Sequence, residues 1–201
     1  MATKNQDSTK NVMLLGKTGA GKSLLGSVLL NDYEIFEAGN STFSWTKDTS
    51  SMTTKDGSYK IFDTKGFMDT ADEILKQDGC PEKMVFNALK TVGTIADEGV
   101  HALLLVMKCE RIGAEDGKLA KDVLARLFNF DVRDHVILVI TNCEDNLVDN
   151  PEEGFKWIRE NAKNKGSNFG KFFSLVKNER RVVFVNNRNP KTVSHLVIFF
   201  C

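Results

Sequence analysis

Apolar residues in this chain gather in five short runs, which are separated by longer polar or mixed segments. The runs are NVMLL at 11–15, YKIFD at 59–63, VHALLLVM at 100–107, HVILVI at 135–140 and RVVFVN at 181–186. Within each run apolar residues follow one another directly instead of alternating with polar ones. Each run therefore predicts a strand that is buried on both faces, which is typical of a parallel sheet covered by helices.

Helical patterns fill the segments between these runs. They start at Lys22 (KSLLGSVLL), at Pro81 (residues 81–96), at 115–128, where Leu119, Val123 and Leu127 form one stripe, and at Pro151 (151–163). The alternation of strands and helices predicts an α/β, doubly wound domain. Residues 1–10 are polar and predict a flexible tail, so we expect the domain to span 11–201, with its last helix cut short.

The first run leads directly into a glycine-rich segment, GKTGAGKS at residues 16–23. It fits the pattern G-x-x-x-x-G-K-S/T between a strand and a helix, where backbone N–H groups turn toward phosphate oxygens. Lys22 would add a positive charge at the β- and γ-phosphates, and the helix N-terminus would add its dipole. The alternative is a glycine-rich turn that binds nothing. We expect a nucleotide to contact Gly19, Ala20, Gly21, Lys22, Ser23 and Leu24.

Two later segments indicate which base the nucleotide carries. The run at 135–140 is followed by TNCED, which places Asn142 and Asp145 in an N-x-x-D spacing. The carboxylate of Asp145 would accept hydrogen bonds from the N1–H and the exocyclic amine of guanine, and adenine does not present both donors. Asn186 and Asn187 follow the last run, where O6 and the ring edge of the base should lie. The alternative for residues 142–145 is an ordinary helix-capping loop.

Candidate ligands for magnesium come from the glycine-rich segment and the second run. The second run ends at Asp63, which would hold magnesium through water, and Ser23 would supply a hydroxyl ligand. Gly66, shortly after Asp63, would offer its N–H to the γ-phosphate.

The Ser/Thr-rich segment 41–57 is suited to a switch loop that becomes ordered when GTP binds. Thr46 is our candidate for the second hydroxyl on magnesium, and we also assign it a part in catalysis. Thr42 and Thr49 are rivals for this role, and a solvated strand threonine is the alternative for Thr46.

Composition indicates which classes of partner and which cellular compartment to expect for this protein. Lys plus Arg equals Asp plus Glu at 27 each, so no overall field favours nucleic acid, and we expect no nucleic-acid partner. The longest apolar run, residues 102–107, is far shorter than the roughly 20 residues of a membrane span. The cysteines, Cys80, Cys109, Cys143 and Cys201, form no C-x-x-C pair and no metal-binding spacing. They predict reduced thiols in a cytoplasmic protein.

Taken in order, the segments GKTGAGKSLLGSVLL, SWTKDT, DTKGFMDT, GVHALLLVMKCERIGAED and NNR resemble the immunity-associated GTPases. This is the GIMAP or avirulence-induced-gene (AIG) family, which is related to septins and to chloroplast import-receptor GTPases. The resemblance spans residues 11–190, and its most specific part is the segment 99–116, which Ras-like proteins lack. It implies a Ras-like P-loop fold with a mostly parallel six-stranded sheet and helices on both faces. It also implies GTP or GDP bound with Mg²⁺, and a homodimer formed across the nucleotide face, peripherally at a membrane.

Two positions depart from the pattern of the family and its relatives. Lys65 replaces the proline of the family's T-P-G turn, which makes this switch turn less rigid. Cys143 stands where most GTPases carry a lysine that lies over the base, which predicts weaker contact with the base.

The residues for hydrolysis leave two functions open. Phe67 stands where Ras-like enzymes carry a glutamine that orients the attacking water, so intrinsic hydrolysis should be slow. Arg111, in the family-specific segment, would neutralise transition-state charge across a dimer; the alternative is a solvated loop charge. The chain is therefore either a slow GTPase activated by dimerisation or a GTP-gated scaffold that barely hydrolyses. A P-loop ATPase or nucleoside kinase is a third candidate, which Asp145 disfavours.

Overall fold

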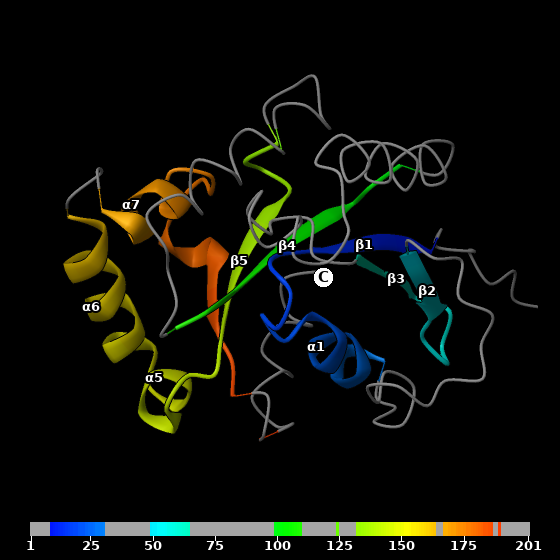
Figure 1. The fold of residues 1–201 in the computed structure, drawn as a ribbon, viewed down its shortest axis with the longest axis horizontal. Helices are drawn as coiled ribbons and strands as arrows, with labels where there is room; N and C mark the ends of the chain where they lie inside the picture. Colours follow the sequence, from blue (N-terminus) through cyan, green and yellow to red (C-terminus); the bar gives the residue numbers. More distant parts are fainter. Residues whose placement is uncertain are drawn as a thin grey trace, which may run out of the picture.

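A six-stranded sheet forms the centre of the part of the chain that the structure describes. The computed structural model describes residues 9–30, 49–64, 99–109, 124, 132–163, 167–186 and 189. The strands are β1 Lys10–Leu15, β2 Thr49–Thr53, β3 Tyr59–Thr64, β4 Ala102–Lys108, β5 Val136–Thr141 and β6 Val182–Phe184. They lie in the order β2-β3-β1-β4-β5-β6, and all neighbours are parallel except β2, which runs antiparallel to β3 (Figure 1). The predicted mostly parallel α/β sheet is confirmed.

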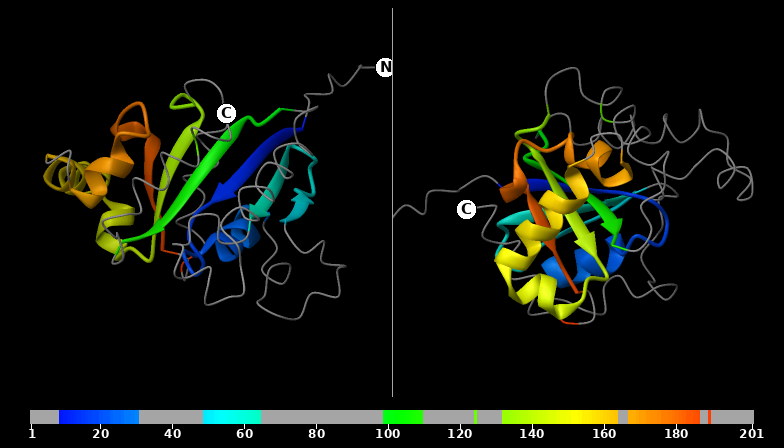
Figure 2. Two further views of the ribbon diagram at one scale, coloured as in Figure 1. Left: turned by 45° about the horizontal axis from the view of Figure 1, so that its top comes forward. Right: turned by 90° about the vertical axis from the view of Figure 1, so that its left-hand side faces the viewer.

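Apolar side chains cover both faces of this sheet, as the uninterrupted apolar runs predict. Met13 and Leu15 of β1 lie in one hydrophobic cluster, and Val12 and Leu14 lie in the other. The first cluster is closed by helices α6 (Pro151–Ala162) and α7 (Asn168–Phe173), through Ile158, Phe169 and Phe172. The second cluster is closed by α1 (Lys22–Leu29), through Leu25. Helices α6 and α7 lie at the β5–β6 end of the sheet, far from β2 (Figure 2).

The start and the packing of α6 follow from three residues. Asn150 precedes the helix, and its side-chain oxygen accepts a hydrogen bond of 3.2 Å from the N–H of Glu152. Pro151 occupies the first turn, where no N–H partner is needed. Gly154 faces β6 so closely that an added Cβ would lie 3.1 Å from the Phe184 ring. The helix therefore begins where the sequence predicts and packs directly on the last strand.

Strand β2 corrects part of the prediction that residues 41–57 form a switch loop, because Thr49–Thr53 form the sheet edge, whereas residues 41–48 lie outside the described residues. Four of these residues are Thr or Ser and only Met52 is apolar, so they give no apolar pattern, and the strand is defined by its pairing with β3. A tight turn joins the two strands. Asp56 accepts hydrogen bonds from Thr54 Oγ1 (2.6 Å) and from Ser58 N and Oγ (3.0 and 2.8 Å). These bonds lower the pKa of Asp56 to about 2.

Other boundaries differ by a few residues. Strand β4 starts two residues later than predicted, and the 3₁₀ turn Glu179–Arg181 replaces the start of the last predicted strand. Helix α5 (Asp145–Asp149) and helix α7 were not predicted. The predicted helices 81–96 and 115–128 lie outside the described residues, apart from Leu124, which is helical and buried. No helix in the described ranges is long and apolar enough to cross a bilayer.

Candidate nucleotide-binding site

The glycine-rich loop lies at the carboxyl edge of the sheet, between β1 and α1. Gly16 follows β1 directly, and a Cβ at this position would lie 2.2 Å from the carbonyl oxygen of Val106 in β4. Only glycine allows the loop to pass so close to the neighbouring strand. Gly21 ends the loop with φ +91°, a left-handed conformation, immediately before the first turn of α1. The loop therefore takes the strand-to-helix course that the motif predicts.

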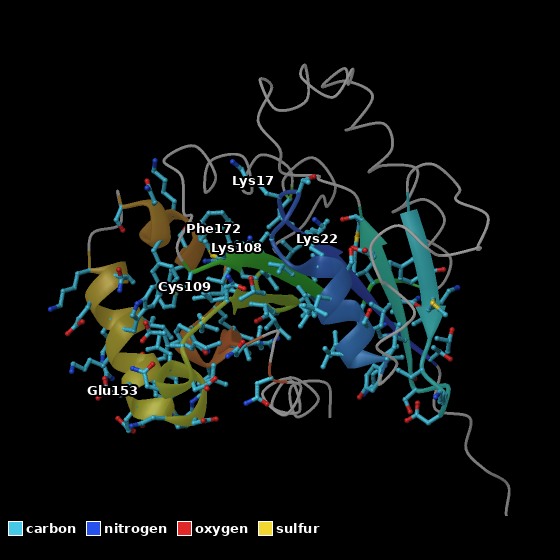
Figure 3. The ribbon with its side chains drawn as sticks, turned by 60° about the horizontal axis from the view of Figure 1, so that its bottom comes forward. Lys17, Lys22, Lys108, Cys109, Glu153 and Phe172 are labelled. Atoms are coloured by element: carbon cyan, nitrogen blue, oxygen red, sulfur yellow. The ribbon has the colours of Figure 1, made fainter. Side chains whose placement is uncertain are left out.

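Lys22 is folded back over this loop. Its side chain is 6% exposed, and Nζ donates hydrogen bonds to the carbonyl oxygens of Gly16 (3.0 Å) and Lys17 (2.8 Å). Figure 3 shows Lys22 at the start of α1 and Lys17 on the preceding loop. The ammonium group is thus held beside the helix N-terminus, where both contribute positive potential.

The predicted phosphate contacts divide into two groups. Ala20 is buried, and its N–H already donates to the carbonyl oxygen of Lys17 (3.1 Å). Ala20 therefore supports the loop, and its N–H is not directed at a ligand in this conformation. Gly19, Ser23 and Leu24 are exposed. Lys22, Ser23 and Leu24 form the first turn of α1, the end of the helix at which the helix dipole favours an anion. This turn is where an anion would bind.

Ser23 and Asp63 meet across the gap between α1 and β3. Ser23 Oγ donates a hydrogen bond of 2.7 Å to Asp63 Oδ2. Asp63 Oδ1 is buried and has no hydrogen-bond partner among the described residues. Burial raises the pKa of the Asp63 carboxyl above its ordinary value, and the Ser23 hydrogen bond and the positive charge of Lys22 oppose this shift. The carboxylate therefore has the capacity for a further positive partner.

This pair fits a small, hard cation. Hydroxyl and carboxylate oxygens are the ligands that Mg²⁺ prefers, and Mg²⁺ commonly completes its shell with water and phosphate oxygens. The described residues contain no group of three His, Cys, Asp or Glu side chains that would hold a metal by themselves. A cation beside Ser23 and Asp63 would therefore depend on a bound phosphate.

The predicted base-recognition residues lie at the ends of β5 and β6. Asn142 is exposed and has a φ of +60°, and Asp145 begins α5. Asn186, after β6, donates a hydrogen bond of 2.8 Å from Nδ2 to Asp145 Oδ1. Two segments that are 41 residues apart thus meet at one point, and Asn186 fixes the Asp145 carboxylate.

Thr141, which was not among the predicted site residues, joins this region to the glycine-rich loop. It is buried, and its Oγ1 lies 2.7 Å from the carbonyl oxygen of Ala20 and 3.2 Å from that of Met107. Its position directly before Asn142 was the available signal. Cys109 and Cys143 are also neighbours, a relation that the sequence does not predict because it depends on the order of the strands.

Several predicted site residues lie outside the described residues. They are Thr46, Gly66, Asn187 and Arg111, together with the rival Thr42 and the departures Lys65 and Phe67. The other rival, Thr49, is the first residue of β2 and pairs in register with Thr64 of β3.

Comparisons with known proteins agree with this arrangement. The family model described as the AIG1 family matches residues 10–195. The chain is 30% identical to GTPase IMAP family member 8 of Rattus norvegicus over 164 residues, which cover 80% of this chain and 22% of that protein. Immune-associated nucleotide-binding proteins of Arabidopsis thaliana are similar at 24–29% identity. The chain spans less than half the length of these curated relatives.

Solved structures of P-loop GTPases share the fold. Toc33 from Arabidopsis thaliana in complex with GDP and Mg²⁺ superposes with a TM-score of 0.57 at 20% identity, covering 90% of this chain and 71% of Toc33. A second structure comes from work on the chloroplast translocon components atToc33 and psToc159, for which dimerisation is important for GTPase activity. It gives a TM-score of 0.54 at 14% identity, covering 90% of this chain and 70% of that one. The fold and the family model agree, and the chain belongs to the AIG1 family.

Proposed function

We propose that this chain binds GTP and GDP together with Mg²⁺ and hydrolyses GTP slowly. The observation that carries the proposal is the hydrogen bond between Asn186 and Asp145, at the same sheet edge as the loop that holds Lys22. A phosphate cradle alone would fit many nucleotides. The Asp145 carboxylate, held by Asn186 at the ends of β5 and β6, would select one base.

The phosphate end of the nucleotide would lie over the first turn of α1. The ammonium group of Lys22 would exchange a carbonyl partner for β- and γ-phosphate oxygens, since charge-assisted hydrogen bonds are stronger than neutral ones. Mg²⁺ would be held by Ser23 and, through water, by Asp63. The ion would supply charge neutralisation at the phosphates. Release of the Ser23 hydroxyl from Asp63 would free it to act as a ligand.

The base would be recognised through Asp145. Its Oδ1 accepts from Asn186, and the remaining lone pairs on both oxygens are available to the N1–H and the exocyclic amine of guanine. Adenine presents a bare N1 in that place and would leave the carboxylate without a partner. Support comes from the similar protein Toc33, whose structure was solved with GDP and Mg²⁺.

Removal of the Lys22 ammonium tests the proposal directly. Lys22→Ala should weaken the binding of GTP and GDP about a hundredfold or more, because a buried charge pair is lost. Lys163→Ala, which removes an exposed lysine at the end of α6, is the matched control and should bind as the native protein does. Calorimetric titration measures both affinities. Normal GTP binding by Lys22→Ala would contradict the phosphate-cradle assignment.

A dimer is proposed as the active form, with the GTP-gated scaffold as the second candidate. Phe67 has no donor or acceptor for the attacking water, so a monomer would hydrolyse GTP slowly. The relation reported for atToc33 and psToc159, between dimerisation and GTPase activity, supports a dimer here. In this proposal Arg111 enters the partner's site. A cytoplasmic location and association with a membrane surface stay predictions.

A further inference from the structure

Two cysteines that are 34 positions apart in the sequence become neighbours at the carboxyl edge of the sheet. Strands β4 and β5 are parallel, with Lys108 paired to Thr141. The N–H of Cys109 continues this ladder with a hydrogen bond of 3.0 Å to the carbonyl oxygen of Thr141. Cys109 thus lies next to the segment 142–145, which we call the base-recognition loop because base recognition is its proposed role. Figure 3 shows it beside Lys108 at the end of β4.

The backbone of Asn142 turns Cys143 to the same side of the sheet as Cys109. Met107 of β4 and Ile140 of β5 share one hydrophobic cluster, and strict alternation would point Asn142 into that cluster and Cys143 away from it. The φ of +60° at Asn142 breaks the alternation. Cys143 is therefore 4% exposed within the cluster, and Cys109 packs against it.

The two thiols interact in the reduced protein. A hydrogen bond with the Cys109 side chain, together with burial, raises the pKa of the Cys143 thiol. The register places Cys109 opposite Asn142, so Cys143 is one residue further along the neighbouring segment. The two cysteines therefore lie on adjacent segments and in one packed cluster, which is the arrangement that a disulfide between them requires.

Only one of the two thiols is accessible. Cys109 is half-buried and lines a cavity of about 380 Å³ between the strand ends and α6, together with Asn142 and Trp157. Cys143 lies behind it in the core. A small oxidant would therefore reach Cys109 first, and Cys143 would act second.

We propose that Cys109 and Cys143 form a reversible intramolecular disulfide that restrains the base-recognition loop and weakens guanine-nucleotide binding. With glutathione disulfide as the oxidant, the Cys109 thiolate attacks one sulfur and releases one glutathione thiolate. Cys143 then loses its proton and attacks Cys109 Sγ, and the second glutathione leaves. Two protein thiols are oxidised and one disulfide is reduced to two thiols. In a reducing compartment such a bond would be transient and regulatory.

The loop contacts explain the effect on binding. The Cys143 thiol donates to the carbonyl oxygen of Ile140 (3.1 Å), and its backbone N–H donates to that of Val185 (3.2 Å), next to Asn186. A disulfide removes the thiol donor and draws Cys143 toward β4. Asp145, two residues further on, would move relative to Asn186. This consequence rests on the proposed function, whereas formation of the bond does not.

The test compares reduced protein with protein treated with glutathione disulfide. After alkylation and digestion, mass spectrometry should find a peptide that links Cys109 to Cys143. Affinity for a fluorescent GDP analogue should fall about tenfold, the loss expected when one hydrogen bond to a charged group is disturbed, and dithiothreitol should restore it. The Cys80→Ser/Cys201→Ser double variant should respond like the native protein, and Cys109→Ser should not respond.

Three results would overturn the inference: absence of the linking peptide, an unchanged affinity once the link has formed, or an undiminished response in Cys109→Ser. Cys143→Ala provides a second check and should also lose the response to the oxidant. If the reduced protein bound no guanine nucleotide, the proposed function would fail, and the mass spectrum would still decide whether the bond forms.

Discussion

Among single residues, the buried carboxyl group of Asp63 lowers the stability of the fold, although it suits the proposed cation site. Its buried Oδ1 has no partner among the described residues, and its raised pKa means that the folded protein disfavours the charged form. A carboxyl group whose pKa is higher in the folded than in the unfolded protein contributes most to stability at pH values below its pKa in the unfolded protein. This contribution is lost as the pH rises through its pKa in the folded protein. A bound cation would offset that cost.

Asp63→Asn should therefore separate stability from function. The melting temperature without nucleotide should stay the same or rise. In the native protein, ionisation of Asp63 should lower the melting temperature as the pH rises, and this effect should be absent in the variant. The gain in GTP affinity on adding Mg²⁺ should be lost, because an amide is a poor ligand for this ion. Thermal unfolding at several pH values and titrations with and without Mg²⁺ measure these effects. An unchanged Mg²⁺ dependence would contradict the assignment.

The position of a residue in the fold could be predicted where the signal is local. Lys22 and Ser23 belong to one eight-residue motif, and Asp63 ends an apolar run, so the sequence predicts where each lies relative to a strand or a helix. Thr141 could not be assigned in this way, because its partner Ala20 lies 121 residues away. Its role depends on which strand ends meet at the loop.

At the scale of elements, the loop between β1 and α1 depends on its contact with β4. In Gly16→Ala the new Cβ would lie 2.2 Å from the carbonyl oxygen of Val106. Because this oxygen belongs to the backbone of β4, no side-chain movement can relieve the clash. We expect a loss of about 3 kcal/mol or more in the free energy of unfolding, with loss of nucleotide binding. Urea denaturation measures the first effect.

Gly57→Ala is the matched control for this substitution. Gly57 lies in the β2–β3 turn with a φ of +76°, and apart from its chain neighbours no atom lies within 4 Å of the place that a Cβ would take. Only the backbone conformation opposes alanine there, so about 1 kcal/mol should be lost and binding should be kept. Equal losses for the two variants would mean that the close approach of Gly16 to β4 is unimportant.

Strands with two buried faces were predictable, and the edge strand was not. The runs that became β1 and β5 are apolar at successive positions, which leaves few alternatives. Strand β2 is Thr-Ser-Ser-Met-Thr, whose side chains give no apolar pattern, and its hydrogen bonds to β3 define it. Sequence patterns report burial, and in this strand Ser51 and Thr53 are exposed and Met52 is half-buried.

For the whole molecule, the order of the strands in the sheet could not be predicted from the apolar pattern of the sequence. The α/β class follows from alternating strands and helices, but the neighbours in the sheet do not. The contact of β4 with β5 brings Cys109 to the base-recognition loop, and that of β5 with β6 brings Asn186 to Asp145. The first relation could be found only from the fold. Asn186 and Asp145 were both assigned to the base from the sequence, and the fold adds the hydrogen bond between them.

The proposed dimer makes a prediction at the same scale. Turnover of GTP per subunit should rise with protein concentration, and Arg111→Ala should lower it at least about tenfold, since an arginine supplied across such an interface is worth about 10³–10⁵ in rate. GTP affinity should stay nearly unchanged. Arg159→Ala, an exposed arginine on α6, is the control. Turnover independent of concentration and of Arg111 would contradict the role of Arg111, and GTP-dependent assembly without turnover would favour the scaffold.

The most direct test of the central claim is a titration of the native protein and of Asp145→Asn with GDP, ADP and xanthosine diphosphate in the presence of Mg²⁺. The native protein should bind GDP at least about tenfold more tightly than ADP, because only guanine presents two donors to the carboxylate. Asp145→Asn should lose affinity for GDP and gain affinity for xanthosine diphosphate, whose C2 carbonyl can accept from the new amide. Equal affinity of the native protein for GDP and ADP would contradict the claim that this site reads guanine.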